Sequence, residues 1–574
     1  MKMFLKAPSM FKLGLVASAC VCALSLQGAH AQTITGPTAA DVQRSIEQNK
    51  PDLNRIAPKR APKQPAAPAT TDQGFARLNA VQLNSPLFQN ELMAYWMSEI
   101  NKPVPAQKLA DFKAFAWELF QSKGYLAYIT TSAQPTPEGS VLTVNVAFPT
   151  VGKVSVVTVD GNKGKEFADE VARRFSAIYK TGTPVDVQGF ENQLNAAAYD
   201  LPVDLEVSMR QVDATVVDVV INLRPVDSTP GKLLGGLVQL NNYGLPQFGR
   251  NQLLGNVRVA GFTPLSEMQL TTQQSRGVGY YRADYMAPIV GTGLRWHTYA
   301  TEVRSNAINA DVRGLSNEVG AGLSKLLSTD RSGRWLAGVA GSARKTQNWN
   351  TGSETADRAD QQVRFKLRAE SSKDWVDNFN NELTFFTGRM NLDRNAADQA
   401  ADADPSLGGN RVAGAYQKIE MNGGLSHVLD KDRTLTGSIR WRAQAASKNL
   451  DTYNRFSLGG TNGMRAYTSL DGVGDQGAQM SFDITHQVVP DVYGSLFYDW
   501  GIVKNSRNPL PTATDTGYYT LQGVGWEVGG KIEDVNWSLS VAHAIGKTPG
   551  SGVWNSSNTV IGDWRVNMAL TKPF

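Results

Sequence analysis

The chain has 574 residues, a formal net charge of +5 and an apolar fraction of 41%. Its length exceeds that of one ordinary domain, and the mild charge does not favour a nucleic-acid partner. The mean hydropathy of −0.29 is low for a helical membrane protein. A transmembrane β-barrel is compatible with that value, because half of each strand faces water.

The N-terminal 31 residues have the pattern of a secretory signal peptide. Lys2, Lys6 and Lys12 form a basic region around the start of an apolar run, 13–26, and Ala29-His30-Ala31 is a small-x-small cleavage site. The apolar run is too short for a spanning helix with normal flanks. We therefore expect an exported protein.

Both cysteines of the chain, Cys20 and Cys22, lie inside this signal peptide. An alternative is a lipoprotein signal cut before Cys20, although the preceding 17–19 (Ala-Ser-Ala) lacks the usual leucine. Cleavage after Ala31 leaves a mature chain without cysteine, which excludes disulfides and thiol chemistry.

Residues 32–50 contain a short helix, predicted from Thr38 to Asn49. Thr38 is a candidate N-cap, and Val42 and Ile46 form a thin apolar stripe. A frayed tail is the alternative. A Pro-rich linker follows at 51–74, whose first twenty residues could span roughly 60 Å at about 3.1 Å per residue.

Two units with the order β-α-α-β-β follow in tandem, at 75–150 and 151–227. In the first we predict a strand near 78–82, helices at 89–100 and 106–123, and strands at 125–131 and 141–148. In the second we predict a strand at 154–159, helices at 165–179 and 185–198, and strands at 205–212 and 216–223. A second linker occupies 227–231.

Residues 228–574 have the alternation of about sixteen strands that cross a membrane. The last of them places Trp564, Val566, Met568, Leu570 and the terminal Phe574 on one side, as in a lipid-facing barrel strand. At 363–370, four apolar residues alternate with Arg364, Lys366, Arg368 and Glu370. Charges face lipid only at high cost, so these basic residues should line a wet lumen. The alternative is a soluble antiparallel sandwich.

The sequence offers no constellation for catalysis, a cofactor or a metal. After the signal peptide, histidine occurs only at 297, 427, 486 and 543, and none has metal-ligand spacing to another His, Asp or Glu. A barrel hydrolase would need a Ser-His pair on neighbouring strands. His486 with a nearby serine is the one arrangement of this kind, and a lone His in a strand is more often structural.

Two segments are more informative. The Gly-rich segment 458–467 lies in a long connection between strands and contains Arg465, a rigid and always charged fork. The alternation of 496–500 turns Phe497 and Asp499 inward. Arg465 and Asp499 can therefore pair inside the lumen. Two independent, solvated charges are the alternative.

These two segments resemble motifs of a known family. Met464-Arg465-Ala466-Tyr467 is similar to the loop motif Val-Arg-Gly-Tyr, and Phe497, Asp499 and Gly501 match Phe-x-Asp-x-Gly. Both belong to the outer-membrane transporters of two-partner secretion, of the haemolysin-activator and filamentous-haemagglutinin transporter type, in the BamA-like superfamily. Ala466 replaces the glycine of the family. If that position requires a positive φ, alanine is strained there.

The resemblance implies a plug helix at Thr38–Asn49, two POTRA domains and a sixteen-stranded barrel, with Arg465 paired to Asp499 inside it. It also implies the function: in the outer membrane of a Gram-negative bacterium, the periplasmic POTRA domains receive one large exoprotein by strand addition, and the barrel passes it unfolded to the surface. Outer-membrane lipid and the barrel assembly machinery, through Phe574, are further expected partners. No cofactor or nucleic acid is expected.

Three alternatives to this function remain. A barrel insertase is disfavoured by having only two periplasmic domains and by the plug helix. A passive porin has no use for two soluble domains. A barrel enzyme lacks its catalytic residues.

Overall fold

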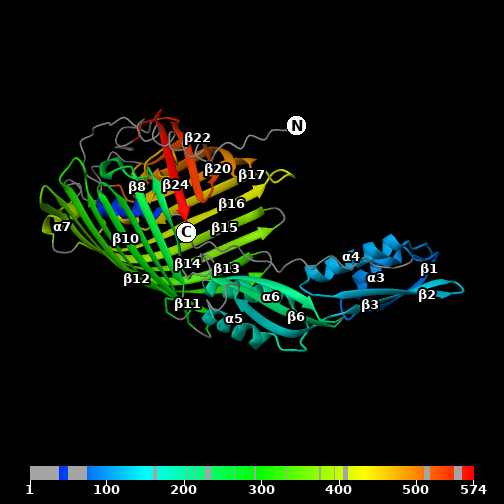
Figure 1. Cartoon of the computed structure of the whole chain (residues 1–574). Helices are drawn as coiled ribbons and strands as arrows, with labels where there is room; N and C mark the ends of the chain where they lie inside the picture. Colours follow the sequence, from blue (N-terminus) through cyan, green and yellow to red (C-terminus); the bar gives the residue numbers. More distant parts are fainter. Residues whose placement is uncertain are drawn as a thin grey trace, which may run out of the picture. The chain divides into compact units, whose positions relative to one another are not determined.

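The computed structural model describes residues 38–48, 74–158, 165–201, 203–213, 215–225, 234–260, 262–263, 265–289, 292–330, 333–373, 376–392, 395–404, 411–509, 517–547 and 559–574. The predicted signal peptide, the predicted Pro-rich linker up to residue 73 and the predicted second linker lie outside these residues. The described chain forms two compact units (Figure 1). One holds the N-terminal helix and the barrel, and the other holds the two α+β domains.

The first α+β domain comprises β1 (Leu78–Asn84), α3 (Gln89–Met97), α4 (Ala106–Ser122), β2 (Tyr128–Thr136) and β3 (Gly139–Ala147). Its sheet has the order β1-β3-β2, with β1 parallel to β3 and β2 antiparallel to it. Both helices pack their apolar faces on this sheet, and Trp96, Phe112 and Phe120 are completely buried. These positions recur at helical spacing, which explains why the helices could be predicted.

Strand β2 differs most from its prediction in this domain. It begins at Tyr128 rather than 125 and continues to Thr136 rather than 131. Its second half pairs with β3, from Ser132 opposite Thr143 to Thr136 opposite Gly139. Most of these residues are exposed and lack apolar alternation, so backbone pairing alone defines this part of the strand.

The second α+β domain repeats the element order, as predicted. It comprises β4 (Thr150–Thr158), α5 (Lys165–Ile178), α6 (Val187–Asp200), β5 (Val203–Gln211) and β6 (Val216–Pro225), with the sheet order β4-β6-β5. Asp186 caps α6 by accepting the N–H of Gly189 at 2.9 Å. The two domains are therefore tandem copies of one topology.

Helix α5 carries a cluster of charged side chains. Glu170 accepts hydrogen bonds from Arg173 at 2.7 Å and from Arg174 at 2.8 Å, and Arg174 also reaches Asp200 at 2.7 Å. Burial alone would raise the pKa of Glu170, but these guanidinium groups outweigh it and hold the pKa below its usual value. The cluster joins α5 to the end of α6.

Among the described residues, sixteen antiparallel strands close into a barrel, which confirms the predicted number (Figure 1). They are β7 (Leu234–Asn241), β8 (Gln252–Ala260), β9 (Glu267–Ser275), β10 (Val278–Ile289), β11 (Leu294–Asn306), β12 (Val312–Asp330), β13 (Gly333–Asn350), β14 (Ser353–Lys373), β15 (Val376–Leu392), β16 (Gly414–Val428), β17 (Leu435–Ala446), β20 (Gln476–Val489), β21 (Val492–Lys504), β22 (Tyr518–Ile532), β23 (Val535–Ile545) and β24 (Trp564–Pro573).

The last strand, β24, closes the barrel against the first, β7. Their pairing runs from Ala569 opposite Asn241 to Pro573 opposite Leu237. Phe574 extends it, because Phe574 and Gly236 exchange two backbone hydrogen bonds of 3.0 and 2.9 Å. The C-terminal residue is thus part of the barrel closure.

The predicted alternation is present in the barrel wall. Val363, Phe365 and Leu367 are 40%, 51% and 38% exposed on the outer face, where an apolar surface can meet lipid. Intervening residues, such as Arg364, belong to the inner face, where Arg364 donates to the hydroxyl of Tyr299 at 3.3 Å. No helix in the described part of the chain is long and apolar enough to cross a membrane.

Candidate functional site: a loop and a helix inside the barrel

The long connection between β17 and β20, residues 447–475, folds back into the barrel. It contains the 3-10 turn η3 (Thr452–Asn454) and a small ribbon of β18 (Phe456–Ser457) with β19 (Val473–Gly474). The segment 458–467 follows the first of these ribbon strands. Its compact course requires glycine, since a Cβ on Gly459 would lie 1.8 Å from the carbonyl oxygen of Thr468.

Arg465 is the central residue of this segment. Its Nη2 lies 2.7 Å from Asp499 Oδ1, its Nε lies 3.1 Å from Asp499 Oδ2, and its backbone N–H donates to the same oxygen at 2.9 Å. Asp499 is 0% exposed and Arg465 is 5% exposed. The guanidinium also lies 3.5 Å from the ring centre of Phe497. The structure therefore brings Arg465, Phe497 and Asp499 together, and their functional role stays a prediction.

A second carboxylate was missed at the sequence level. Asp483 on β20 accepts from Arg465 Nη1 at 2.5 Å and from Arg440 Nη2 at 3.3 Å. The register of β20 and β21 places it directly opposite Phe497. The alternation of 482–486 does turn Asp483 inward, so the signal was present.

Apolar contacts fix the rest of the loop motif. Met464, Ala466 and Tyr467 are all 0% exposed, in one cluster with Phe497 and other inner-wall residues. Tyr467 also donates to the carbonyl oxygen of Gln522 at 3.0 Å. A Cβ on Gly501 would meet Leu458 Cδ2 at 2.5 Å and Met464 Sδ at 3.0 Å. Glycine at this position therefore gives the loop room to lie against the wall.

The concern that Ala466 is strained does not apply. Among the described residues, non-glycine positions with positive φ include Phe88, Leu265 and Arg411, but not Ala466. The alanine methyl instead faces Gly523 on β22, where an added Cβ would lie 3.0 Å from it. The extra methyl of this chain is accommodated by a glycine on the opposite surface.

Helix α2 (Ala39–Gln48) also lies within the barrel unit, one residue shorter at each end than predicted. Thr38 and Asp41 cap its start reciprocally. Asp41 N–H donates to Thr38 Oγ1 at 3.2 Å, and Thr38 N–H donates to Asp41 Oδ2 at 2.9 Å. Val42 and Ile46 are buried with residues near one end of the barrel, including Phe248 and Tyr280. The helix is packed and not frayed.

Most other contacts of α2 are polar. Gln43 donates to Glu318 at 2.9 Å and accepts from Ser316 at 2.7 Å, both on β12.

The hydroxyls of Ser45 and Ser469 lie 2.6 Å apart, which joins the helix to the 447–475 connection. Tyr453 donates to Glu47 at 2.6 Å, and Arg44 donates to the carbonyl oxygen of Thr452. The helix is thus held by both the wall and the connection.

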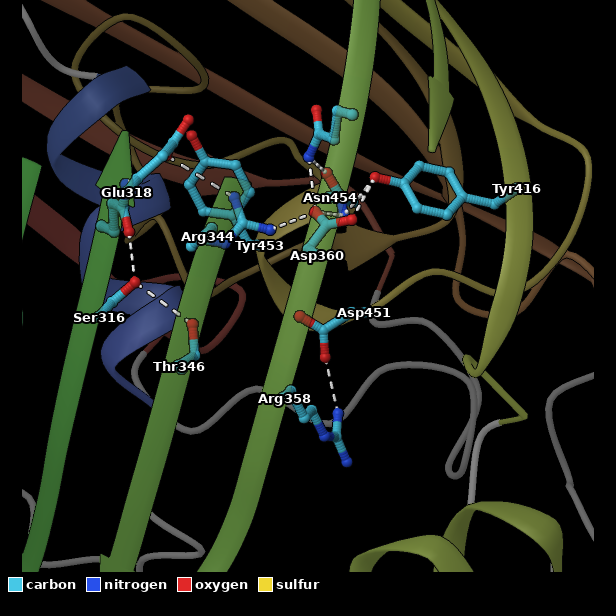
Figure 2. A network of polar contacts seen from close by, with 12 residues as sticks. Ser316, Glu318, Arg344, Thr346, Arg358, Asp360, Tyr416, Asp451, Tyr453 and Asn454 are labelled. Atoms are coloured by element: carbon cyan, nitrogen blue, oxygen red, sulfur yellow. Dashed lines mark hydrogen bonds and ion pairs between the residues drawn. The ribbon is translucent and has the colours of Figure 1, made fainter. Parts of the chain in front are cut away.

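A polar network extends these contacts along the wall (Figure 2). Arg344 forms an ion pair with Asp360 at 2.6 Å, and its guanidinium lies 3.4 Å from the ring centre of Tyr453. Asp360 also accepts from Tyr416 at 2.8 Å and from Asn454 at 2.9 Å. Strands β13, β14 and β16 are thereby linked to η3. Helix, connection and wall share one network.

The described residues contain no group of three or more His, Cys, Asp or Glu side chains that could hold a metal. His486 is exposed on β20, opposite Gly494 of β21. No arrangement in the described chain thus favours catalysis at this position.

Comparison with known proteins gives the family. The model for the haemolysin secretion/activation proteins ShlB/FhaC/HecB matches residues 221–528, more than half of the chain. The chain belongs to this family. No curated protein matches the sequence at a significant level. The recognition of a two-partner secretion transporter from the loop motifs is confirmed.

Solved structures support the fold. CdiB from Escherichia coli aligns at 14% identity with a TM-score of 0.62, covering 95% of this chain and 100% of that one. CdiB from Acinetobacter baumannii aligns at 14% identity with a TM-score of 0.56, and the alignment covers 94% of this chain and 100% of that one. BamA from Haemophilus ducreyi, lacking POTRA domains 1–3, aligns at 10% identity with a TM-score of 0.52, and the alignment covers 87% of this chain and 100% of that one.

The family match and the closed barrel identify an outer-membrane β-barrel transporter of the two-partner secretion type. The two α+β domains precede the barrel and have the β-α-α-β-β order expected of POTRA domains. The family is one of transporters and not of enzymes.

Proposed function

We propose that the chain exports one large secreted protein, which the POTRA domains recognise in the periplasm and the barrel passes unfolded to the cell surface. The observation behind this proposal is the way in which the two segments inside the barrel, helix α2 and the 447–475 connection, are held. Helix α2 buries Val42 and Ile46 and otherwise makes hydrogen bonds that water can replace. The 447–475 connection is continuous with two barrel strands and is anchored by an apolar cluster and by Arg465.

In this account, transport requires α2 to leave the lumen. The Pro-rich linker would keep the helix attached while it is outside. Anchoring of the loop to the wall by Arg465, Asp483 and Asp499 would keep part of the lumen ordered while a chain passes.

With no nucleotide in the periplasm, folding of the exported protein outside is the driving force. Equal export rates for a partner that cannot fold outside would contradict this.

The POTRA sheets offer edges for strand addition. The strands at the edges are β1 and β2 in the first domain and β4 and β5 in the second. An extended segment of the exported protein can add to such an edge through main-chain hydrogen bonds. Recognition of this kind accounts for the two soluble domains, which a passive porin does not need.

Deletion of 75–226 tests the proposal against a porin. We expect the deletion to abolish export of the large secreted protein that is the proposed cargo, while the barrel remains in the outer membrane and conducts ions. The amount of folded barrel, judged by its heat-dependent gel mobility, is the control. Undiminished export would remove the proposed role of the POTRA domains.

An insertase role predicts a different outcome. Loss of this protein would then lower the amounts of several unrelated outer-membrane barrels. We expect their amounts to stay unchanged and only the one large secreted protein to disappear from the medium.

A further inference from the structure

A basic hollow of about 650 Å³ lies on the barrel beside the end of β15 and the start of β16. Arg389, Arg411 and Lys448 line it, and we call it the rim hollow. Arg411 belongs to the connection that includes α7 (Ala396–Ala403), and Lys448 to the beginning of the 447–475 connection. Three separate segments thus bring their cations to one place.

The rim hollow lies at the edge of the apolar outer surface. On β15, Leu383 and Phe385 are 38% and 40% exposed on the outer face. Arg389 lies on the same face four residues later, about 13 Å further along the strand. Its neighbours in register are Gln361 and Ala415, so the apolar surface has ended at this level. Lipid headgroups occupy such a level.

The strand order fixes the end of the barrel at which the hollow lies. Because adjacent strands are antiparallel around the barrel, β15 runs in the same direction as β7. The end of β15 is therefore at the barrel end opposite to Leu234, where β7 begins. With the POTRA domains in the periplasm, as proposed above, this end faces the outer leaflet.

The positive side chains that line the rim hollow outnumber the negative ones. Within the described chain, Arg389, Arg411 and Lys448 form no ion pair. Arg389 Nε donates to Asn391 at 3.2 Å, and Lys448 Nζ donates to the carbonyl oxygen of Ala413. Asp402 also lines the hollow, so the summed charge of these four residues is positive.

Asp402 holds the backbone directly after Arg411 in place. Its two carboxylate oxygens accept the N–H groups of Val412 at 2.8 Å and Ala413 at 3.1 Å. Arg411 itself has a φ of +53°, a conformation that residues with a Cβ rarely adopt. Such a backbone persists only when its surroundings impose it, and the bonds from Asp402 do so. The placement of Arg411 is therefore built into the fold.

We propose that the rim hollow binds the phosphate groups of a phosphorylated glycolipid in the outer leaflet. Arginine forks and a lysine are the side chains that bind phosphate best. The amide groups of Asn391 and Gln399, which also line the hollow, suit sugar hydroxyls. The hollow would fix the barrel's outer rim, and the base of the 447–475 connection at Lys448, to the membrane surface.

Binding of lipid A, a phosphorylated glucosamine disaccharide lipid, to the full-length protein in neutral detergent tests this proposal. The triple variant Arg389→Gln, Arg411→Gln and Lys448→Gln should raise the Kd on the order of a hundredfold, because each cation near a charged headgroup contributes roughly fivefold. Dephosphorylated lipid A should bind the parent protein as weakly as lipid A binds the triple variant.

The matched control removes three exposed cations at the other end of the barrel, with Lys431→Gln, Arg433→Gln and Lys531→Gln. This variant should bind lipid A within twofold of the parent protein. The proposal would be overturned if the parent protein and the triple variant of the rim hollow (the rim variant) bound lipid A equally. It would also be overturned if the parent protein bound lipid A and dephosphorylated lipid A equally. Competition by millimolar inorganic phosphate would overturn it too, because it would indicate a site for free phosphate. Should the triple variant fail to fold, the exposed Arg389→Gln change alone should weaken binding about fivefold.

Export assays in the same strains separate this inference from the proposed function. Loss of glycolipid binding by the rim variant, with export above half of the parent level, supports the rim site and leaves the transporter account intact. Loss of export on POTRA deletion is independent of this result.

Discussion

The segment 458–467 and helix α2 are both buried inside the barrel unit, but they are held in different ways. The segment belongs to a connection joined to strands on both sides, and its Met464, Ala466 and Tyr467 pack in an apolar cluster. The helix belongs to no strand connection of the barrel. It buries Val42 and Ile46, and most of its other contacts are polar.

On the account proposed above, this difference separates a permanent part of the lumen from a removable one. A polar contact contributes only about 1 kcal/mol net, because water replaces it when it breaks. An apolar cluster and a buried ion pair lose far more when they are exposed or left unpaired. We therefore expect the loop to stay in place when the helix leaves.

The largest effect should follow Arg465→Ala. The change leaves Asp499 completely buried without its cation, and Asp483 with only Arg440, which costs about 3–5 kcal/mol. Export should fall below a tenth of the parent level while folded barrel is still present, as judged by heat-dependent gel mobility. The double change with Asp499→Ala should be no worse than the single one. The control is Arg304→Ala, which removes an exposed pair with Glu302 and should have little effect.

A smaller effect should follow Gly501→Ala on β21. The new Cβ meets Leu458 and Met464, so the loop must shift, at a cost of about 1–3 kcal/mol. The melting temperature of the barrel in detergent should fall. Gly494→Ala on the same strand adds a Cβ with no atom within 4 Å and is the matched control. Equal melting temperatures for the two variants would show that the loop does not press on Gly501.

Weakening the helix should have an effect of a different kind. Tyr453→Phe removes the 2.6 Å hydrogen bond to Glu47, worth about 1 kcal/mol. The barrel should remain equally stable, but the open fraction in single-channel recordings should rise about fivefold. Tyr281→Phe on the outer face is the control. An unchanged open fraction would mean that this bond does not retain the helix.

The smallest effect concerns the second α+β domain and depends on pH. Because the pKa of Glu170 is lowered in the folded protein, its pairing with Arg173 and Arg174 stabilises the domain above the ordinary pKa of glutamate. This contribution is lost as the pH falls through the lowered value. Glu170→Gln should therefore reduce amide exchange protection in α5 at pH 7, by roughly 1 to 2 kcal/mol, and progressively less as the pH falls below the ordinary pKa of glutamate. The same loss at every pH would contradict the pairing.

Much of the fold could be predicted because the physical signals are local. Alternation along single strands identified the barrel, and helical spacing in 106–122 identified α4. The second half of β2 could not be found this way, since its residues are exposed and only pairing with β3 defines it. Helix α2 was left open between a plug and a frayed tail, because its burial depends on partners such as Glu318 and Tyr453, remote in sequence.

The residues of the site could be predicted where they belong to a sequence motif. Arg465 and Asp499 came from the loop and strand motifs. Alternation along β20 turns Asp483 inward, but its place opposite Phe497 and beside Arg465 depends on the register between β20 and β21. The relation of Ala466 to Gly523 could not be foreseen, because it depends on which strand faces the loop. Contacts between distant segments are what the sequence alone does not supply.

Two crosslinks test the central claim most directly, since Cys20 and Cys22, both in the predicted signal peptide, are the only cysteines of the sequence. Ser45→Cys with Ser469→Cys, whose hydroxyls lie 2.6 Å apart, would tie the helix to the connection. Ala466→Cys with Gly523→Cys, whose Cβ atoms would lie 3.0 Å apart, would tie the loop to the wall. When oxidised, the first should block export until a reductant is added, and the second should leave export intact. Full export through the oxidised helix crosslink would contradict the account.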